Sequence, residues 1–149
     1  MYTAKKQEKI NKINFEIFPV YISDVLKKMH KTQAEALEPL SLSAIHAPYM
    51  TTLYRYPEGL TMAELSKLLR LDKANTSRAM NELLEKGYAE KTEDKKKNSV
   101  LRLTKSGAKA AESLTESTIN FINEVLSPLD GFEKRRLYRL LFKLASKKD

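Results

Sequence analysis

The middle of the chain carries the start and stop signals of two consecutive short helices. Thr61, with Glu64 three residues later, has the pattern of a capping box, in which each side chain accepts a hydrogen bond from the other residue's backbone N–H. Asp72 can cap a second helix over 73–86, and Gly87 suits the left-handed conformation that ends a helix. Two helices joined by so short a turn predict a helix-turn-helix.

Apolar periodicity predicts a further helix before this pair and a hairpin after it. The earlier helix covers about 41–55, and Pro48 is tolerated there only if the helix begins late. Residues 88–92 and 99–104 have the pattern of two short strands joined by a polar loop. This order of elements is that of a winged helix-turn-helix.

Helices with apolar stripes are predicted at both ends of the chain. The first covers residues 5–30, with a kink or a restart at Pro19, and residues 31–40 form a connection. Two more helices are predicted at 105–126 and 132–147. The wide stripe of the first helix has to pack on something, and a second subunit is one candidate.

Composition narrows the class of protein. The 149 residues are 42% hydrophobic, which suffices for a core, and the absence of cysteine excludes disulfides and thiol chemistry. The net charge of +8 suits a polyanionic partner, although some basic proteins are merely soluble. No apolar run approaches the ~20 residues that span a bilayer, and the polar start lacks the pattern of a signal peptide. We therefore expect a cytoplasmic protein that does not bind a membrane.

The start of the second short helix has the side chains that a DNA-reading helix needs. Asn75 can pair with adenine and Arg78 with guanine, each through two hydrogen bonds in the major groove. Short polar and basic side chains beside them suit phosphate or mixed contacts, namely Lys73, Thr76 and Ser77. A solvated helix start is the alternative for the whole run 73–78.

The predicted hairpin loop favours the DNA-reading interpretation over a solvated helix start. Lys95, Lys96 and Lys97 would stand together at its tip, where they repel one another on a free surface and are favourable beside a phosphate backbone. From residue 67 to 105 there are 11 Lys and Arg against 6 Asp and Glu, a net charge of +5. These charges favour double-stranded DNA as the partner.

Two stretches of the chain resemble a known family. Residues 60–87, Leu-Thr-Met-Ala-Glu-Leu-Ser-Lys-Leu-Leu-Arg-Leu-Asp-Lys-Ala-Asn-Thr-Ser-Arg-Ala-Met-Asn-Glu-Leu-Leu-Glu-Lys-Gly, closely resemble the MarR family of bacterial transcriptional regulators. Residues 103–107, Leu-Thr-Lys-Ser-Gly, resemble the "LT-x-x-G" that leads from the wing into a dimerisation helix. The resemblance extends over nearly the whole chain.

The resemblance implies a mainly α fold (α+β winged helix) and a homodimer. It divides the chain into an N-terminal dimerisation helix with its connection at 1–40, a winged helix-turn-helix DNA-binding domain at 41–104, and C-terminal dimerisation helices at 105–149. The function it implies is sequence-specific DNA binding by a repressor of a palindromic operator, relieved by a small and possibly phenolic molecule.

The resemblance also carries over individual positions. Those that fall where family members contact DNA from the recognition helix are Lys73, Ala74, Asn75, Ser77 and Arg78. At the wing, Lys95 stands where the family usually has Asp, and Lys97 stands where it has the Arg that enters the minor groove. Lysine is a point charge without the planar fork of arginine, so we expect wing contacts here to be more phosphate-like.

A small aromatic effector is a further expectation from the resemblance, because family members bind such compounds between the dimerisation region and the head. The aromatic residues that could line the pocket are Phe15, Phe18, Tyr49 and Tyr54. Core and interface packing is the alternative for each of them.

We expect no metal, no cofactor and no enzymatic activity. His30 and His46 are the only histidines, and ordinary surface or core positions are the alternative to a metal site. None of the four glycines forms a phosphate-binding loop, and no catalytic constellation stands out. The alternative function is that of a winged-helix adaptor for a protein partner, which would have an apolar recognition face instead of the polar residues 73–78.

Overall fold

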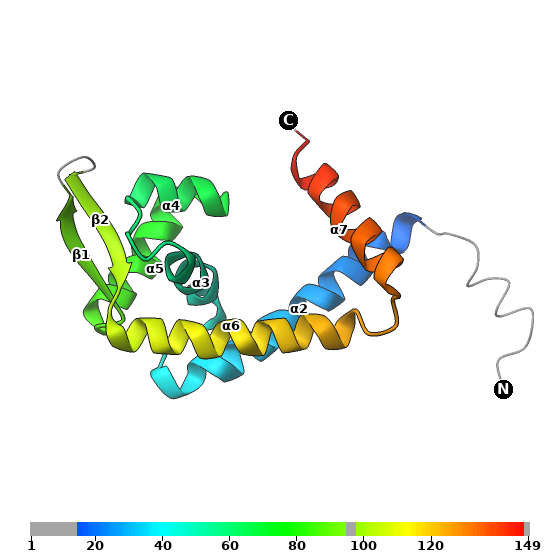
Figure 1. Ribbon diagram of the computed structural model, residues 1–149, viewed down its shortest axis with the longest axis horizontal. Helices are drawn as coiled ribbons and strands as arrows, with labels where there is room; N and C mark the ends of the chain where they lie inside the picture. The colour runs from blue at the N-terminus through cyan, green and yellow to red at the C-terminus, as the bar shows by residue number, and fades with distance from the viewer. Residues whose placement is uncertain (1–14, 95–97, 148–149) are drawn as a thin grey trace, which may run out of the picture.

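The structure is a computed structural model that describes residues 15–94 and 98–147, and it places a winged head at one end of a long helical arm (Figure 1). The α-helices and strands are α2 (Phe18–Leu37), α3 (Ala47–Arg55), α4 (Met62–Leu69), α5 (Lys73–Glu85), β1 (Ala89–Asp94), β2 (Asn98–Leu103), α6 (Lys105–Val125) and α7 (Gly131–Ala145). Short 3-10 helices are η1 (Phe15–Ile17), η2 (Glu38–Leu40) and η3 (Ala44–His46). The predicted fold class, mainly α with a winged helix-turn-helix core, is confirmed.

The N-terminal helix differs from its predicted bounds. α2 begins at Phe18 with Pro19 in its first turn, where a missing N–H costs nothing, so the predicted restart is confirmed. It continues to Leu37, and the prediction of a connection at 31–40 is therefore wrong over its first seven residues. Ala34 and Ala36 favour the helix, and the side chain of Leu37 is fully buried. The predicted start of this helix lies outside the described residues.

α3 begins late, as Pro48 requires. The helix proper starts at Ala47, which places Pro48 in the first turn, and η3 precedes it with Ser43 as its N-cap. The helix predicted at 41–55 thus includes the 3-10 helix η3, which the sequence pattern does not separate from the α-helix.

The core of the head forms where α3, α4, α5, the hairpin and the first half of α6 meet. Its most deeply buried apolar side chains are Met50, Leu53, Leu65, Met80, Leu83, Val100, Ala111 and Leu114. In α4 the sequence predicts Leu65, Leu68 and Leu69 as the buried face, but Leu68 is 50% exposed. An eight-residue helix turns only one narrow side to the core, and Leu65 occupies its centre.

The wing is a two-stranded antiparallel hairpin. Its register runs from Ala89 opposite Leu103 to Asp94 opposite Asn98, so the strands extend closer to the tip than predicted. A bridge between Leu60 and Leu101 joins β2 to the segment before α4. The predicted tip lysines at 95–97 lie outside the described residues.

The wing meets α6 through a close backbone contact. Thr104 caps α6 by accepting a hydrogen bond from Gly107 N–H at 3.1 Å, and its hydroxyl donates to Gly87 O at 2.7 Å. A Cβ on Gly107 would lie 1.8 Å from Tyr88 O, so only glycine fits this position. The "LT-x-x-G" segment is therefore a packing joint.

The arm consists of α2, α6 and α7. Figure 1 shows α2 and α6 crossing in contact, with α7 turning back beyond the end of α6. α7 is capped by Asp130 and Glu133 and has no buried side chain. No helix in the described part of the chain is long and apolar enough to cross a membrane.

Candidate nucleic-acid interface

The cap of α5 fixes the start of the candidate reading helix. The Oδ1 atom of Asp72 accepts a hydrogen bond from Asn75 N–H at 2.8 Å, as the sequence predicts for an N-cap. This backbone hydrogen bond stabilises the charged carboxylate and lowers the pKa of Asp72 below its ordinary value. The helix therefore begins on an ionised cap at neutral pH.

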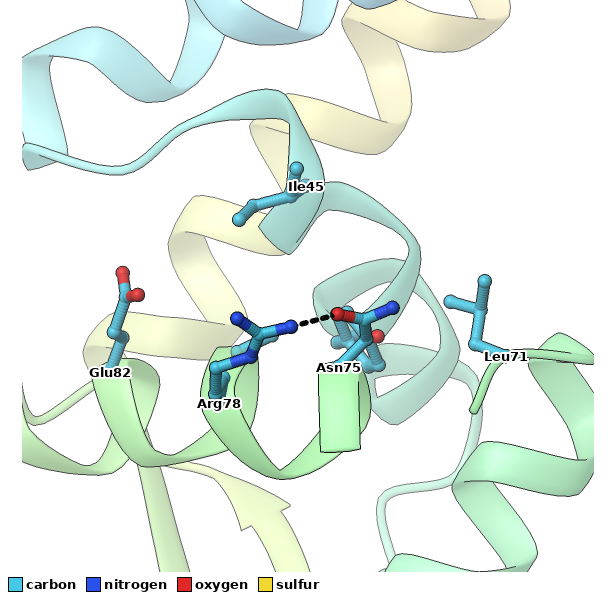
Figure 2. A pocket seen from close by; sticks show the side chains of 7 residues that line it. Ile45, Leu71, Asn75, Arg78 and Glu82 are labelled. Carbon is cyan, nitrogen blue, oxygen red and sulfur yellow. Dashed lines mark hydrogen bonds between the residues drawn. The ribbon is translucent and has the colours of Figure 1, made fainter. Parts of the chain in front are cut away.

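A series of side-chain hydrogen bonds runs from this cap along α5. Asn75 Nδ2 donates to the other oxygen of Asp72, and Arg78 Nη2 donates to Asn75 Oδ1 (Figure 2). Both ends of the Asn75 amide are thus engaged. Arg78 has five N–H donors, so one bond to Asn75 leaves its remaining donors available to a base.

The predicted reading residues divide by exposure. Lys73, Ala74, Asn75 and Arg78 are exposed, and Ser77 is half-buried. Thr76 is 0% exposed, and its hydroxyl donates to Asp72 O at 2.9 Å. The prediction that Thr76 faces DNA is therefore corrected, because its side chain packs inside the head.

The described part of the wing adds a fixed arginine that the sequence reading missed. Arg102 Nε donates to Glu58 O at 2.9 Å, which ties β2 to the turn before α4. In the sequence, Arg102 could have been noticed as the single basic residue between Leu101 and Leu103. Lys95, Lys96 and Lys97 stay predicted contacts, since the structure does not describe them.

A hollow of about 440 Å³ opens beside the reading helix. Figure 2 shows Asn75, Arg78 and Glu82 of α5 along one wall, with Ile45 of η3 opposite and Leu71 at the end. Tyr49 and Ala79 complete the lining. The hollow is therefore apolar on the η3 and α3 side and polar along α5.

The predicted aromatic pocket is not formed as a single site. Tyr49 lines the hollow beside α5, whereas Phe18 lines a different one on α2 together with Ile22 and His30. Tyr54 lines neither of these two, and the side chain of Phe15 lies outside the description. Phe18 and Tyr49 thus line two separate hollows, and the ligand pocket stays a prediction.

The two histidines occupy different surroundings. His30 is exposed on α2, whereas His46 is buried between Ser43 and Glu82. Among the described residues, no group of three His, Cys, Asp or Glu side chains could hold a metal ion.

Comparison with known proteins finds a similarity to one family. Residues 40–97 match the model of the MarR family, and these residues run from the end of η2 to the wing tip. The HTH-type transcriptional regulator BilQ of Clostridium symbiosum is 32% identical over 93 residues, which are 61% of this chain and 65% of that protein. Over its winged head the chain is similar to the MarR family. The aligned part is thus less than two thirds of the length of BilQ.

Solved structures of similar proteins share the fold. The wild-type apo form of MarR from E. coli is 26% identical, with a TM-score of 0.62, and covers 85% of this chain and 95% of its own. The S. aureus MepR–DNA complex is 22% identical, with a TM-score of 0.77, and covers 91% of this chain and 97% of its own.

Proposed function

We propose that the chain is a sequence-specific DNA-binding transcriptional regulator, a cytoplasmic homodimer that represses from a palindromic operator and is released by a small aromatic ligand. The observation that carries the proposal is the exposed pair Asn75 and Arg78 on the first turns of α5. They stand on a head whose fold matches that of MepR, a relative solved in complex with DNA. The similarity of residues 40–97 to the MarR family is the support for repression.

The geometry of α5 suits the major groove. The groove admits one helix, and the N-terminal turns of a recognition helix contact base edges. Lys73 and the free N–H groups of the first turn can hold a phosphate while Arg78 pairs with guanine. The same helix thereby supplies both affinity and sequence reading.

The arm supports a homodimer. Apolar side chains that α2 leaves exposed are Phe18, Val20, Tyr21, Ile22, Val25 and Leu26, and those that α7 leaves exposed are Phe132, Tyr138, Leu140, Leu141, Phe142 and Leu144. A monomer rarely leaves so many large apolar groups in water. In this proposal residues 41–104 form the head, and 1–40 and 105–149 form the arm that a second copy covers.

The hollow beside α5 supports a ligand that competes with DNA. Its volume of about 440 Å³ lies in the range of small-molecule sites. An aromatic ring would pack against Ile45, Tyr49 and Leu71, and an acidic group would pair with Arg78. A ligand held this way would bind the guanidinium group of Arg78, which could then no longer contact the operator.

Selection of bound duplexes from a random pool, with the full-length protein, tests the proposal. We expect enrichment of a palindrome whose half-sites lie about one helical turn, ~34 Å, apart. Repeating the selection with salicylate-like acids should reduce recovery. Recovery of duplexes without any shared sequence would refute sequence-specific regulation.

A further inference from the structure

A buried histidine outside the predicted reading face contacts the candidate recognition helix. His46, the last residue of η3, is 2% exposed, and its Nε2 atom lies 2.9 Å from Oε2 of Glu82 on α5. The Glu82 side chain is 49% exposed. Glu82 follows Arg78 by one helical turn on the same wall of the hollow (Figure 2).

The other ring nitrogen of His46 lies against Ser43. Nδ1 accepts from Ser43 N–H at 3.2 Å in the capping box of η3. Ser43 O lies at the same 3.2 Å from Nδ1, so the contacts with Ser43 do not fix the tautomer of the ring. A carboxylate can only accept a hydrogen bond, so Glu82 is matched by an Nε2 atom that carries a proton. The 2.9 Å approach of the two side chains does not have the geometry of a regular hydrogen bond, and the Glu82 side chain is 49% exposed.

Glu82 is the group that lies against the buried Nε2 atom of His46. In the described part of the chain, His46 Nε2 has no regular hydrogen-bond partner, and Glu82 is the acidic side chain that reaches it. A buried polar nitrogen is costly to leave unpaired, which favours the conformation that keeps Glu82 close. The ring therefore constrains α5 at the level of Glu82.

Two further hydrogen bonds join the same segment to the end of α5. Lys86 Nζ donates to Ser41 O at 2.6 Å, and the Tyr88 hydroxyl donates to Leu40 O at 3.5 Å. Residues 38–46 lead from α2 of the arm into the head. The segment is thus held against α5 and its C-terminal end at three points, of which the His46–Glu82 contact lies nearest to Arg78.

We infer that His46 is a positioning residue for DNA reading, which acts through Glu82 on the face of α5 that carries Asn75 and Arg78. This inference rests on the proposed function. A side chain that contacts a base through two hydrogen bonds tolerates a displacement of only about 0.5 Å. Long charged side chains that contact phosphate tolerate larger displacements. Loss of the contact should therefore lower sequence discrimination more than it lowers general DNA affinity.

The test measures the ratio of affinities for the selected operator and a scrambled duplex, with full-length protein well below its unfolding temperature. Glu82→Ala should lower this ratio about tenfold. Glu85→Ala removes the same charge from the same helix outside the hollow and should leave the ratio unchanged. His46→Ala should match Glu82→Ala, and the double variant should be no worse than Glu82→Ala alone.

His46→Gln separates positioning from mere packing, because its amide can still donate to Glu82. We expect it to retain the ratio within about threefold. Equal ratios for Glu82→Ala and Glu85→Ala would overturn the inference, as would a double variant that loses the product of both single effects. If the wild-type protein prefers no duplex, the proposed function itself has failed.

Discussion

Arg78 donates a hydrogen bond from Nη2 to Oδ1 of Asn75, so the two residues best suited to read bases are already joined before DNA arrives. Asn75 is bonded in turn to Asp72, the cap of the helix. The cap therefore orients the guanidinium through one intervening amide. These bonds leave Asn75 one amide hydrogen and one oxygen lone pair for adenine, whereas Arg78 keeps four N–H donors for guanine, which makes Arg78 the stronger reader.

Replacement of Arg78 by Ala should cost about 1–3 kcal/mol of operator binding and relax preference at one base pair. The reason is the loss of a two-hydrogen-bond contact that no neighbouring side chain can replace. Affinities for operators with each base at every position of one half-site would measure this. Lys73→Ala is the matched control, and it should weaken all of these duplexes to a similar extent. Unchanged preference at every position in Arg78→Ala would remove Arg78 from the reading face.

Replacement of Lys97 by Ala should weaken binding to selected and scrambled duplexes alike. A lysine at the wing contacts phosphate as a point charge, so it adds affinity without sequence information. The slope of log affinity against log salt should fall by about 1. Loss of discrimination with an unchanged slope would show that the wing reads sequence.

Acid should remove the contribution of the Asp72 cap to stability. The pKa of Asp72 is lower in the folded chain than its ordinary value of 3.8, because the carboxylate accepts the Asn75 N–H. A lowered folded pKa gives stability that is complete above pH 3.8 and is lost as pH falls through the lowered value. Asp72→Asn keeps an N-cap but cannot titrate, so its difference from wild type in unfolding free energy should shrink in acid. A difference that stays constant from pH 7 to pH 2 would exclude this linkage.

Replacement of Phe142 by Asp should dissociate the dimer. Phe142 is 74% exposed on α7, and a carboxylate buried there by a second copy would lack a partner. Sedimentation at micromolar concentration should change from dimer to monomer, with operator affinity falling because two heads no longer bind together. Ile45→Asp, at an exposed apolar position on the head, should sediment as wild type. A wild-type protein that sediments as a monomer would contradict the dimer.

Replacement of Gly107 by Ala should destabilise the head by about 1–3 kcal/mol. The added Cβ would meet Tyr88 O at 1.8 Å, which forces the wing and α6 apart. Denaturant unfolding measures the loss. Gly131→Ala is the control, because its Cβ would lie 3.6 Å from the mobile end of Arg135. Equal stability of the two variants would show that the joint can open freely.

Local signals in the sequence predicted most of the head. The caps at Thr61, Asp72 and Thr104 act within three residues of themselves, so their hydrogen bonds could be read from spacing alone. Thr76 shows where a polar run misleads. It stands three, four and seven residues before Ala79, Met80 and Leu83, and that spacing places it on the buried stripe.

The hollow could not be predicted in the same way. Ile45 lies on η3 and Leu71 lies between α4 and α5, and the spacing of neither residue along the chain shows that the two line one hollow. The contact between His46 and Glu82 joins residues 36 positions apart, on elements whose crossing depends on packing of the whole head. Such sites follow from tertiary structure, which spacing along one helix does not contain.

The central claim is sequence-specific DNA binding, and a paired titration tests it most directly. The selected operator and a scrambled duplex of equal length are bound by the full-length protein between 50 and 200 mM salt. We predict that both affinities fall steeply with salt and that the operator binds at least about 1,000-fold more tightly throughout. Equal affinity for the two duplexes, or affinity that does not respond to salt, would contradict the claim.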